Sequence, residues 1–232
     1  MLNPVGHWCR GRVVEVRHPH PRAVVLRLEV RDRIDHLPGQ HYVIRLRAED
    51  GYTATRSYSL ASAPHEPVVE FYVEELADGE VSPYLAEAVE VGDELELRGP
   101  IGGWFVWDGR TPAVGIAGGT GVVPLISMQR HAGRLGTENL LHLAVSSRTL
   151  AELPYADELA ASHATIALSR ERSGNGRAAG RLTAAEVAPY VDPASTYYIC
   201  GSAGFAESAS ELLMSLGVPP GVVRVERFGP SG

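Results

Sequence analysis

The pattern of hydrophobic residues changes once along this chain, near residue 100. Before that point, short apolar runs alternate with polar residues, as in residues 11–19, 23–30, 41–48, 67–76 and 93–100. Alternation with a period of two is typical of antiparallel strands. Five or six strands at this spacing predict a small antiparallel β-barrel. One helix is predicted within it, over residues 82–89, with Ser82 as N-cap and Pro83 as the first helical residue.

The second half alternates short apolar runs with helical patterns. Strands are predicted over residues 112–119, 139–147, 164–169, 196–202 and 222–228. Helices are predicted over residues 122–133, 155–162 and 205–217, the first closed by Gly133 and the last by Gly217. This order indicates a parallel, Rossmann-like sheet covered by helices on both faces. We therefore expect two domains, residues 1–104 and 105–232, with the boundary between Gly99 and Asp108.

Composition excludes several classes of protein. The chain has 232 residues, of which 44% are hydrophobic and 21% charged, values typical of globular domains. Its two cysteines are too few for a disulfide scaffold, a zinc knuckle or a cysteine-ligated iron–sulfur cluster, and we expect no metal site. A net charge of −7 disfavours nucleic-acid binding. No run of about 18 apolar residues predicts a membrane span, and Met1 to Arg10 lacks a signal layout, so we expect a cytoplasmic protein.

Charge is unevenly distributed along the chain. Residues 1–60 carry ten arginines and six acidic residues, whereas residues 61–100 carry one arginine and eleven acidic residues. Two interpretations stay open. The two groups are either solvated faces of a small β domain or, for the basic segment, a dock for an acidic protein partner.

Two glycine-rich turns follow predicted strands of the second half. Ala117 to Pro124 reads AGGTGVVP, and its glycines would let backbone N–H groups approach a pyrophosphate at a helix N-terminus. Cys200 to Gly204 reads CGSAG and also joins a strand to a helix. Ligands bind at the carboxyl edge of a parallel sheet, so Cys200 is expected to face the binding crevice. Each turn by itself is equally compatible with a purely structural role.

Two motifs of the first half suit phosphate binding. Arg56 to Ser62 reads RSYSLAS on a predicted strand, where Arg56 can form a forked contact with a phosphate and Tyr58 shares its face. Asp78 to Ser82 reads DGEVS before the short helix, whose free N–H groups also suit a phosphate. In isolation, a surface arginine and a capped turn explain them equally well.

Together and in this order, the motifs resemble those of the ferredoxin–NADP reductase superfamily over nearly the whole chain. RSYS is similar to that family's flavin motif, GEVS to its second pyrophosphate-binding turn, and GGTGVVP to its nicotinamide-dinucleotide loop. Further similarities are PGQHY (Pro38 to Tyr42), GPIG (Gly99 to Gly102), CGSAGF, LGVP and the final ERFG.

The resemblance implies FAD as a cofactor and assigns residues to it. Arg56 would bind the pyrophosphate, Tyr58 would stack on the isoalloxazine, and Ser59 would lie near flavin N5. Gly79, Val81 and Ser82 would bind the FAD phosphates. The same resemblance places among the cofactor-binding residues Ser57, Tyr72 and Val73. Phe228 matches an aromatic residue that covers the flavin ring, although here four residues follow it.

The resemblance also implies a pyridine nucleotide, NADPH or NADH. Its pyrophosphate would be held by Gly118, Gly119, Thr120 and Gly121, and Gly201 would lie close by. Cys200 would lie against the nicotinamide, and Ser59, Cys200 and Glu226 would form a polar catalytic relay for the flavin proton. Ser169 and Arg170 match positions that bind the ribose 2′-phosphate, which favours NADPH, with Arg148 nearby and Arg177 or Arg181 adding charge.

The expected activity is electron transfer from NAD(P)H through FAD to a separate acceptor protein, an iron–sulfur, molybdenum or haem protein. One alternative is a free-flavin or ferric-chelate reductase with a diffusible acceptor. A second alternative, from another class, is a non-catalytic FAD- or nucleotide-binding subunit of a complex. Among oligomeric states, we expect a monomer.

Overall fold

The computed structural model describes residues 7–229, so part of the N-terminal segment considered above lies outside it. The chain divides between Val106 and Trp107 into two compact units. Unit 1 ends at Val106 and unit 2 begins at Trp107, a division that falls inside the predicted interval Gly99 to Asp108. Each unit is described separately below.

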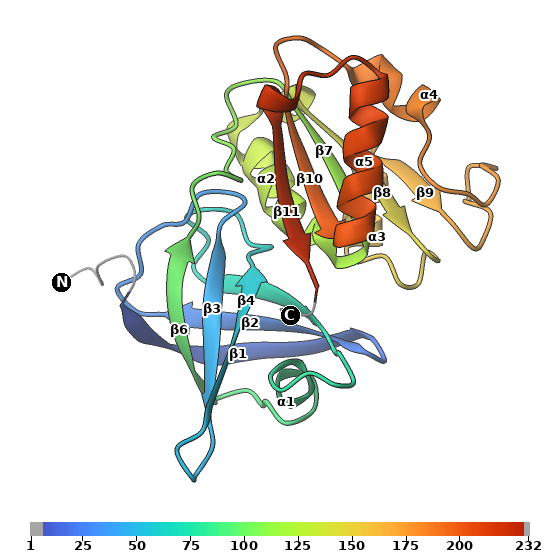
Figure 1. The fold of residues 1–232 in the computed structure, drawn as a ribbon. Coiled ribbons are helices and arrows are strands. Elements are labelled where there is room, and N and C mark those ends of the chain that lie inside the picture. The colour runs from blue at the N-terminus through green and yellow to red at the C-terminus, as the bar shows by residue number, and fades with distance from the viewer. Residues whose placement is uncertain (1–6, 230–232) are drawn as a thin grey trace. The chain divides into compact units, whose positions relative to one another are not determined.

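Unit 1 is built on one antiparallel sheet of six strands (Figure 1). The strands are β1 (Trp8–His20), β2 (Ala23–Val30), β3 (His41–Arg47), β4 (Thr53–Ser59), β5 (Val69–Glu74) and β6 (Glu94–Ile101). Their order in the sheet is β4-β3-β6-β1-β2-β5. The outer strands β4 and β5 approach each other through the isolated bridge between Leu60 and Phe71. The predicted antiparallel sheet is confirmed, and it is barrel-like without closing.

Alternation explains the register of the unit 1 strands. On β6, Leu95 and Leu97 are buried while Glu94 is exposed, as their spacing predicts. The core enclosed by the sheet contains Tyr42 and Phe71, whose rings meet edge to face with centroids 6.1 Å apart. A Cβ atom on Gly99 would lie 2.6 Å from the Tyr42 ring, so a glycine is required where β6 crosses this ring.

The N-cap of the short helix α1 (Ser82–Glu87) lies one residue earlier than predicted. Val81, not Ser82, is its N-cap, and Val81 makes no side-chain capping bond. The Ser82 hydroxyl instead accepts a hydrogen bond from the Leu76 N–H at 3.0 Å. The prediction of Ser82 as N-cap is therefore wrong, because this hydroxyl closes the turn before the helix.

Unit 2 contains the predicted parallel sheet of five strands, and their order in the sheet is β11-β10-β7-β8-β9 (Figure 1). The strands are β7 (Ala113–Gly118), β8 (Leu141–Ser147), β9 (Thr165–Leu168), β10 (Thr196–Ser202) and β11 (Val223–Phe228). The α-helices are α2 (Val123–Leu135), α3 (Ala156–Ala161), α4 (Ala184–Val187) and α5 (Ala203–Ser215). The 3-10 turns are η1 (Gly119–Val122), η2 (Glu138–Leu140), η3 (Ala188–Tyr190) and η4 (Pro220–Val222).

Each of the two long helices is followed by a glycine in the left-handed conformation. Helix α2 runs past Gly133 and ends at Leu135, with Gly136 as its C-cap at φ 69°. The prediction that Gly133 closes this helix is wrong, because the closing residue must adopt the left-handed conformation that Gly136 adopts. Helix α5 ends at Ser215 and Gly217 follows with φ 81°, in agreement with the predicted end.

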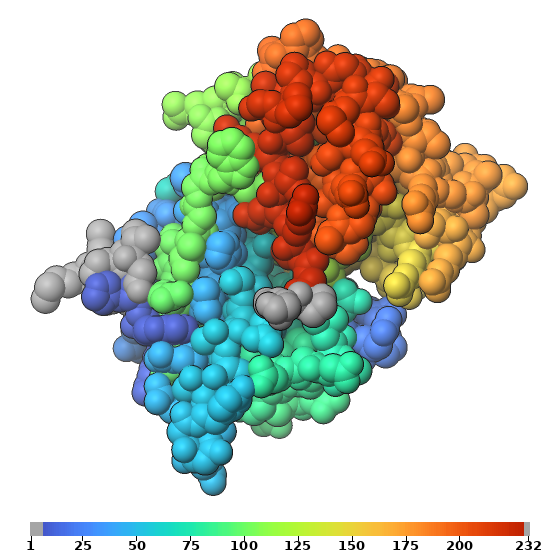
Figure 2. Space-filling view, viewed as in Figure 1, coloured from blue at the N-terminus to red at the C-terminus, as the bar shows by residue number. Residues whose placement is uncertain are grey.

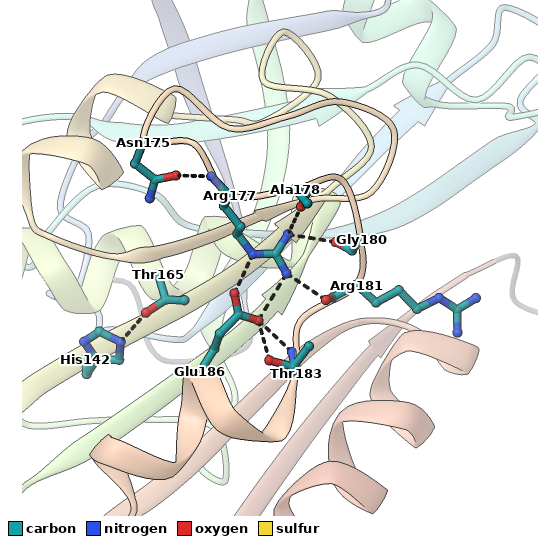
Figure 3. A network of polar contacts seen from close by, with 9 residues as sticks. All are labelled: His142, Thr165, Asn175, Arg177, Ala178, Gly180, Arg181, Thr183 and Glu186. Carbon is teal, nitrogen blue, oxygen red and sulfur yellow. Dashed lines mark hydrogen bonds and ion pairs between the residues drawn. The ribbon is translucent and has the colours of Figure 1, made fainter.

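The segment between β9 and α4 is held by one partly buried arginine, Arg177 (Figure 3). The Arg177 guanidinium donates to both carboxylate oxygens of Glu186, at 2.5 and 3.1 Å. It also donates to the carbonyls of Ala178, Gly180 and Arg181. Glu186 in turn accepts from the N–H and hydroxyl of Thr183, which forms the capping box of α4. This loop is therefore held together by hydrogen bonds among its own residues and to α4.

The ion pair predicts a pH-dependent stability. Hydrogen bonding to Arg177 lowers the pKa of Glu186 to about 2. A lowered carboxyl pKa stabilises the fold above the ordinary pKa, and this stabilisation is lost as pH falls toward 2. We expect Glu186→Gln to reduce the free energy of unfolding by about 1–3 kcal/mol at pH 7. Urea unfolding followed by circular dichroism should show the difference shrinking between pH 5 and pH 3.

A matched control is Glu207→Gln, which removes the same charge from an exposed position on α5. It should leave stability unchanged at both pH values. A Glu186→Gln effect of equal size at pH 7 and pH 3 would contradict the assignment to this ion pair.

Candidate functional site

The ligand-binding edge of unit 2 is defined by its topology. From β7 the chain continues outward to β8 and β9, and then restarts at β10 on the opposite side of β7. The carboxyl ends of β7 and β10 therefore form a topological switch point, where crevices of parallel sheets bind ligands. Ala117 and Cys200 pair directly across these two strands. The two predicted glycine-rich turns are thus brought together.

Backbone contact between the two turns requires the glycines. A Cβ atom on Gly121 would lie 2.1 Å from the Cys200 carbonyl oxygen, and one on Gly118 would lie 2.6 Å from the Phe205 ring. Gly119 adopts φ 55° with open space around it. Turn η1 leads from these glycines directly into the 13-residue helix α2. Free N–H groups at the start of this helix suit a pyrophosphate.

Cys200 and Glu226 are partners across β10 and β11. Cys200 is fully buried, and burial raises the pKa of its thiol well above the ordinary value. Glu226 is half-buried, and burial raises the pKa of its carboxyl to about 7. The pair therefore combines a thiol that stays protonated with a carboxyl that exchanges its proton near neutral pH, as proton transfer requires.

Phe228 ends strand β11, two residues after Glu226 and paired with Ser202. Its side chain is half-buried. It therefore lies at the same sheet edge as Cys200 and Gly201, and its role over a flavin ring stays a prediction.

Two exposed arginines lie side by side at the ends of β8 and β9. The Arg170 N–H donates to the Arg148 carbonyl at 2.9 Å, and the Ser169 N–H donates to the Ser147 carbonyl at the same distance. Within residues 7–229, neither guanidinium has a side-chain or carbonyl partner, so both charges face solvent. This edge can bind an anion such as a phosphate monoester.

Arg177 does not contribute to this cation cluster. Its guanidinium is committed to Glu186 and three carbonyls, as described above (Figure 3). The expectation that Arg177 adds charge for a nucleotide is therefore wrong, whereas the Arg181 side chain stays exposed.

The flavin motif lies on β4, an outer strand of the unit 1 sheet. Arg56 pairs with Ile44 and Tyr58 with Tyr42 across β3, so Arg56 and Tyr58 share a face as predicted. Arg56 and Ser57 are exposed, Tyr58 is half-buried against the core, and Ser59 is buried. Burial raises the pKa of Tyr58 to about 12, so its ring carries a neutral hydroxyl.

Sequence reasoning missed two residues near this motif, Glu80, which contacts Arg56, and Tyr52, which contacts Glu80. Arg56 donates to the Glu80 carboxylate at 3.3 Å, and the other oxygen of Glu80 accepts from the Tyr52 hydroxyl at 2.5 Å. Glu80 belongs to the GEVS turn, so the first and second predicted phosphate motifs meet through an ion pair. The sequence contained one indication of this ion pair. Glu80 is an acidic residue within a motif that is predicted to bind a phosphate.

The turn before α1 is closed by its own backbone. The Gly79 N–H donates to the Leu76 carbonyl at 2.8 Å, and a Cβ atom on Gly79 would lie 3.0 Å from that carbonyl oxygen. The Ser82 hydroxyl accepts from Leu76 and keeps its own hydrogen for a further acceptor. Val81 is fully buried.

The predicted residues of β5 are also buried. The Val73 side chain is fully buried, and Tyr72 is 8% exposed. A cofactor would therefore meet the Val73 backbone rather than its side chain.

Gln40 positions the end of β4. Its side-chain amide donates to the Gly102 carbonyl at 2.6 Å and accepts from the Leu37 N–H at 2.7 Å. Its own carbonyl accepts from the Leu60 N–H at 3.2 Å. The PGQ turn thus ties the residue after Ser59 to the end of β6.

Comparison with known proteins agrees with this geometry. Residues 15–106 match the family described as the oxidoreductase FAD-binding domain. The chain is 28% identical to the naphthalene 1,2-dioxygenase system ferredoxin–NAD(P)(+) reductase component of Pseudomonas putida, over 96% of this chain and 70% of that protein. It is 30% identical to the propane 2-monooxygenase reductase component of Mycolicibacterium smegmatis, over 93% of this chain and 66% of that protein.

A solved structure shows the same fold. The flavohem-like FAD/NAD-binding domain of nitric oxide dioxygenase from Vibrio cholerae superposes with a TM-score of 0.83 at 24% identity, over 96% of this chain and 99% of that domain. The chain spans between 55% and 70% of the length of four curated relatives, which are reductase or electron transfer components.

Residues 15–106 thus match an FAD-binding domain, and they are followed by a five-stranded parallel sheet of a topology that is typical of nucleotide-binding domains. The chain is similar to ferredoxin–NAD(P)(+) reductase components over most of its length.

Neither a metal site nor a membrane-spanning helix is found in the described part of the chain, residues 7–229. No group of three or more His, Cys, Asp or Glu side chains in this part is arranged to hold a metal ion. No helix in it has the length and hydropathy needed to span a membrane.

The raised pKa of Glu226 predicts a second pH dependence, of opposite sign to that of Glu186. Because the folded state favours the protonated carboxyl, stability is highest below the ordinary pKa and falls as pH rises toward 7. We expect the wild type to lose about 1–3 kcal/mol between pH 4.5 and pH 8 relative to Glu226→Gln. Parallel pH profiles of both proteins would contradict the shifted pKa.

Proposed function

We propose that this chain is an NAD(P)H-dependent flavoprotein reductase that passes electrons through FAD to a separate acceptor protein. The observation that carries the proposal is the joining of the glycine turn to the Cys200 turn at the switch point of unit 2, in a chain whose residues 15–106 match an FAD-binding domain. FAD, when bound, converts a two-electron hydride donor into a source of single electrons.

In unit 1, the residues available to hold FAD are those of β4 and of the turn before α1. Arg56 offers a charge-assisted contact to a phosphate, and Tyr58 offers a ring face with a neutral hydroxyl. Ser82 retains a hydroxyl hydrogen that can donate to a phosphate oxygen. The donor set of this unit therefore fits a flavin with a pyrophosphate.

In unit 2, the glycines from Gly118 to Gly121 admit a pyrophosphate to the backbone that opens α2. A Cβ atom on Gly121 would lie 2.1 Å from the Cys200 carbonyl oxygen, so no side chain fits at this position of the turn. Arg148 and Arg170 are exposed cations at the ends of the next two strands, and neither guanidinium has a partner within residues 7–229. With Ser169 they can bind a 2′-phosphate, which favours NADPH over NADH.

Cys200 and Glu226 are proposed to act in the chemical step. Cys200 supplies a small thiol that stays protonated near the end of β10. The carboxyl of Glu226, with its pKa near 7, holds or releases a proton at working pH. Ser59 is buried at the end of β4 and is proposed to hydrogen-bond to the flavin.

The names of similar proteins support the proposed class of electron acceptor. Several of them are named as reductase components of dioxygenase or monooxygenase systems. An iron–sulfur protein, or a haem or molybdenum protein, is the acceptor class that fits single-electron transfer from a flavin. A free-flavin reductase is the second candidate, favoured by the ion pair that already occupies Arg56.

The FAD site predicts the effect of removing Arg56. Arg56→Ala should weaken FAD binding about 10- to 100-fold, because a charge-assisted contact contributes about 1.5–3 kcal/mol. Fluorescence titration of the apoprotein with FAD measures the change. Arg31→Ala, which removes an exposed arginine of the same unit, is the control. Unchanged FAD affinity in Arg56→Ala would refute the assignment.

The nucleotide site predicts a discrimination effect. Arg170→Ala should lower kcat/KM for NADPH about tenfold and leave that for NADH unchanged, because only NADPH carries the 2′-phosphate. Steady-state kinetics with ferricyanide as acceptor measure both. Arg110→Ala, at the opposite edge of the same sheet, should affect neither nucleotide. Equal losses with the two nucleotides would remove Arg170 from the phosphate site.

A further inference from the structure

Arg56, which is proposed to bind the FAD pyrophosphate, already forms an ion pair with the carboxylate of Glu80. Arg56 Nη2 donates to Glu80 Oε2 at 3.3 Å, while Nη1 donates to the Thr55 carbonyl at 2.7 Å. The second oxygen of Glu80 accepts from the Tyr52 hydroxyl at 2.5 Å. The guanidinium is therefore held at two of its nitrogens, and Glu80 is held at both of its oxygens.

The three side chains come from different parts of unit 1. Tyr52 belongs to the turn between β3 and β4, which projects from unit 1 at the cyan lower end of both views (Figure 1 and Figure 2). Arg56 lies on β4, and Glu80 lies in the turn before α1. The network thus links both segments that carry the flavin-motif resemblance.

Stability does not account for this ion pair. The side chains of Arg56 and Glu80 are 45% and 48% exposed, and pairs this exposed add little to folding. A phosphate and a carboxylate use the same N–H groups of a guanidinium, and two anions at one cation repel each other. A pyrophosphate that reaches Arg56 must therefore displace Glu80 or accept its repulsion.

We propose that Glu80 is a specificity-determining residue of the FAD site, whose carboxylate competes with the pyrophosphate for Arg56. The inference rests on the proposed function, because it takes Arg56 to be the pyrophosphate ligand. Glu80 weakens the binding of phosphate-bearing flavins and leaves riboflavin, which has no phosphate, unaffected. Glu80 thereby reduces the preference of the site for FAD over riboflavin, and it makes bound FAD exchangeable. Tyr52 strengthens the competition because its hydroxyl holds Glu80 beside Arg56.

The test is a titration of the apoprotein with FAD and, separately, with riboflavin, followed by flavin fluorescence at low ionic strength. Glu80→Gln keeps the shape of the side chain and removes its charge, so the dissociation constant for FAD should fall about 3- to 10-fold. That for riboflavin should stay unchanged. Tyr52→Phe should tighten FAD binding in the same direction and by less. Added salt should reduce the gain for FAD, because the competition is electrostatic.

Glu87→Gln is the matched control, since Glu87 is an exposed carboxylate on α1 and has no side-chain partner among the described residues. It should leave both dissociation constants unchanged. Melting of the apoproteins shows whether each variant is folded, and the exposed positions of Tyr52 and Glu80 predict melting temperatures close to that of the wild type.

The double variant Arg56→Ala/Glu80→Gln separates this inference from the function on which it rests. The gain from Glu80→Gln should disappear when Arg56 is absent. FAD binding that is unchanged or weaker in Glu80→Gln, with Arg56→Ala still impaired, would overturn the competition and leave the FAD site intact. An Arg56→Ala variant with normal FAD affinity would overturn the FAD assignment itself.

Discussion

The contact between two backbone turns is the constraint on which the rest of unit 2 depends. Gly121 lies so close to the Cys200 carbonyl that no other residue fits there. This contact holds the start of α2 against the end of β10, at the point where the strand order reverses. A helix N-terminus, a buried thiol and the neighbouring carboxyl of Glu226 are thereby collected at one sheet edge.

Burial and partners decide what the arginines of this chain can do. Arg177 is enclosed by its own loop and stabilises it, whereas the side chains of Arg148 and Arg170 are exposed at the adjacent strand ends. Arg56 is intermediate, because it is exposed but paired with Glu80. Arginines of this chain thus stabilise a loop, are available to bind an anion, or pair with a carboxylate that competes with a phosphate. Their contacts distinguish these roles.

Sequence patterns were sufficient for the fold and for the placement of the motifs. The change from period-two alternation to strand–helix alternation predicted both sheets, and the glycines from Gly118 to Gly121 predicted a turn between a strand and a helix. The same reasoning misplaced the α1 N-cap at Ser82 and the end of α2 at Gly133. Both errors arose because a hydroxyl or a glycine has several local uses, and the backbone conformation selects among them.

Contacts between distant residues could not be predicted in this way. The pairing of Glu80 with Arg56 joins residues on separate elements and follows no sequence period. The enclosure of Arg177 depends likewise on how its loop folds back toward α4. The raised pKa of Glu226 depends on burial, which a strand pattern of alternating residues does not reveal.

The most direct measurement of the central claim is the absorbance at 450 nm of the FAD-reconstituted protein after anaerobic addition of NADPH or NADH. The proposed function predicts that the flavin band bleaches within seconds, and faster with NADPH. A protein that binds FAD and nucleotide but whose band does not change with either donor would contradict the reductase function and favour a non-catalytic binding subunit.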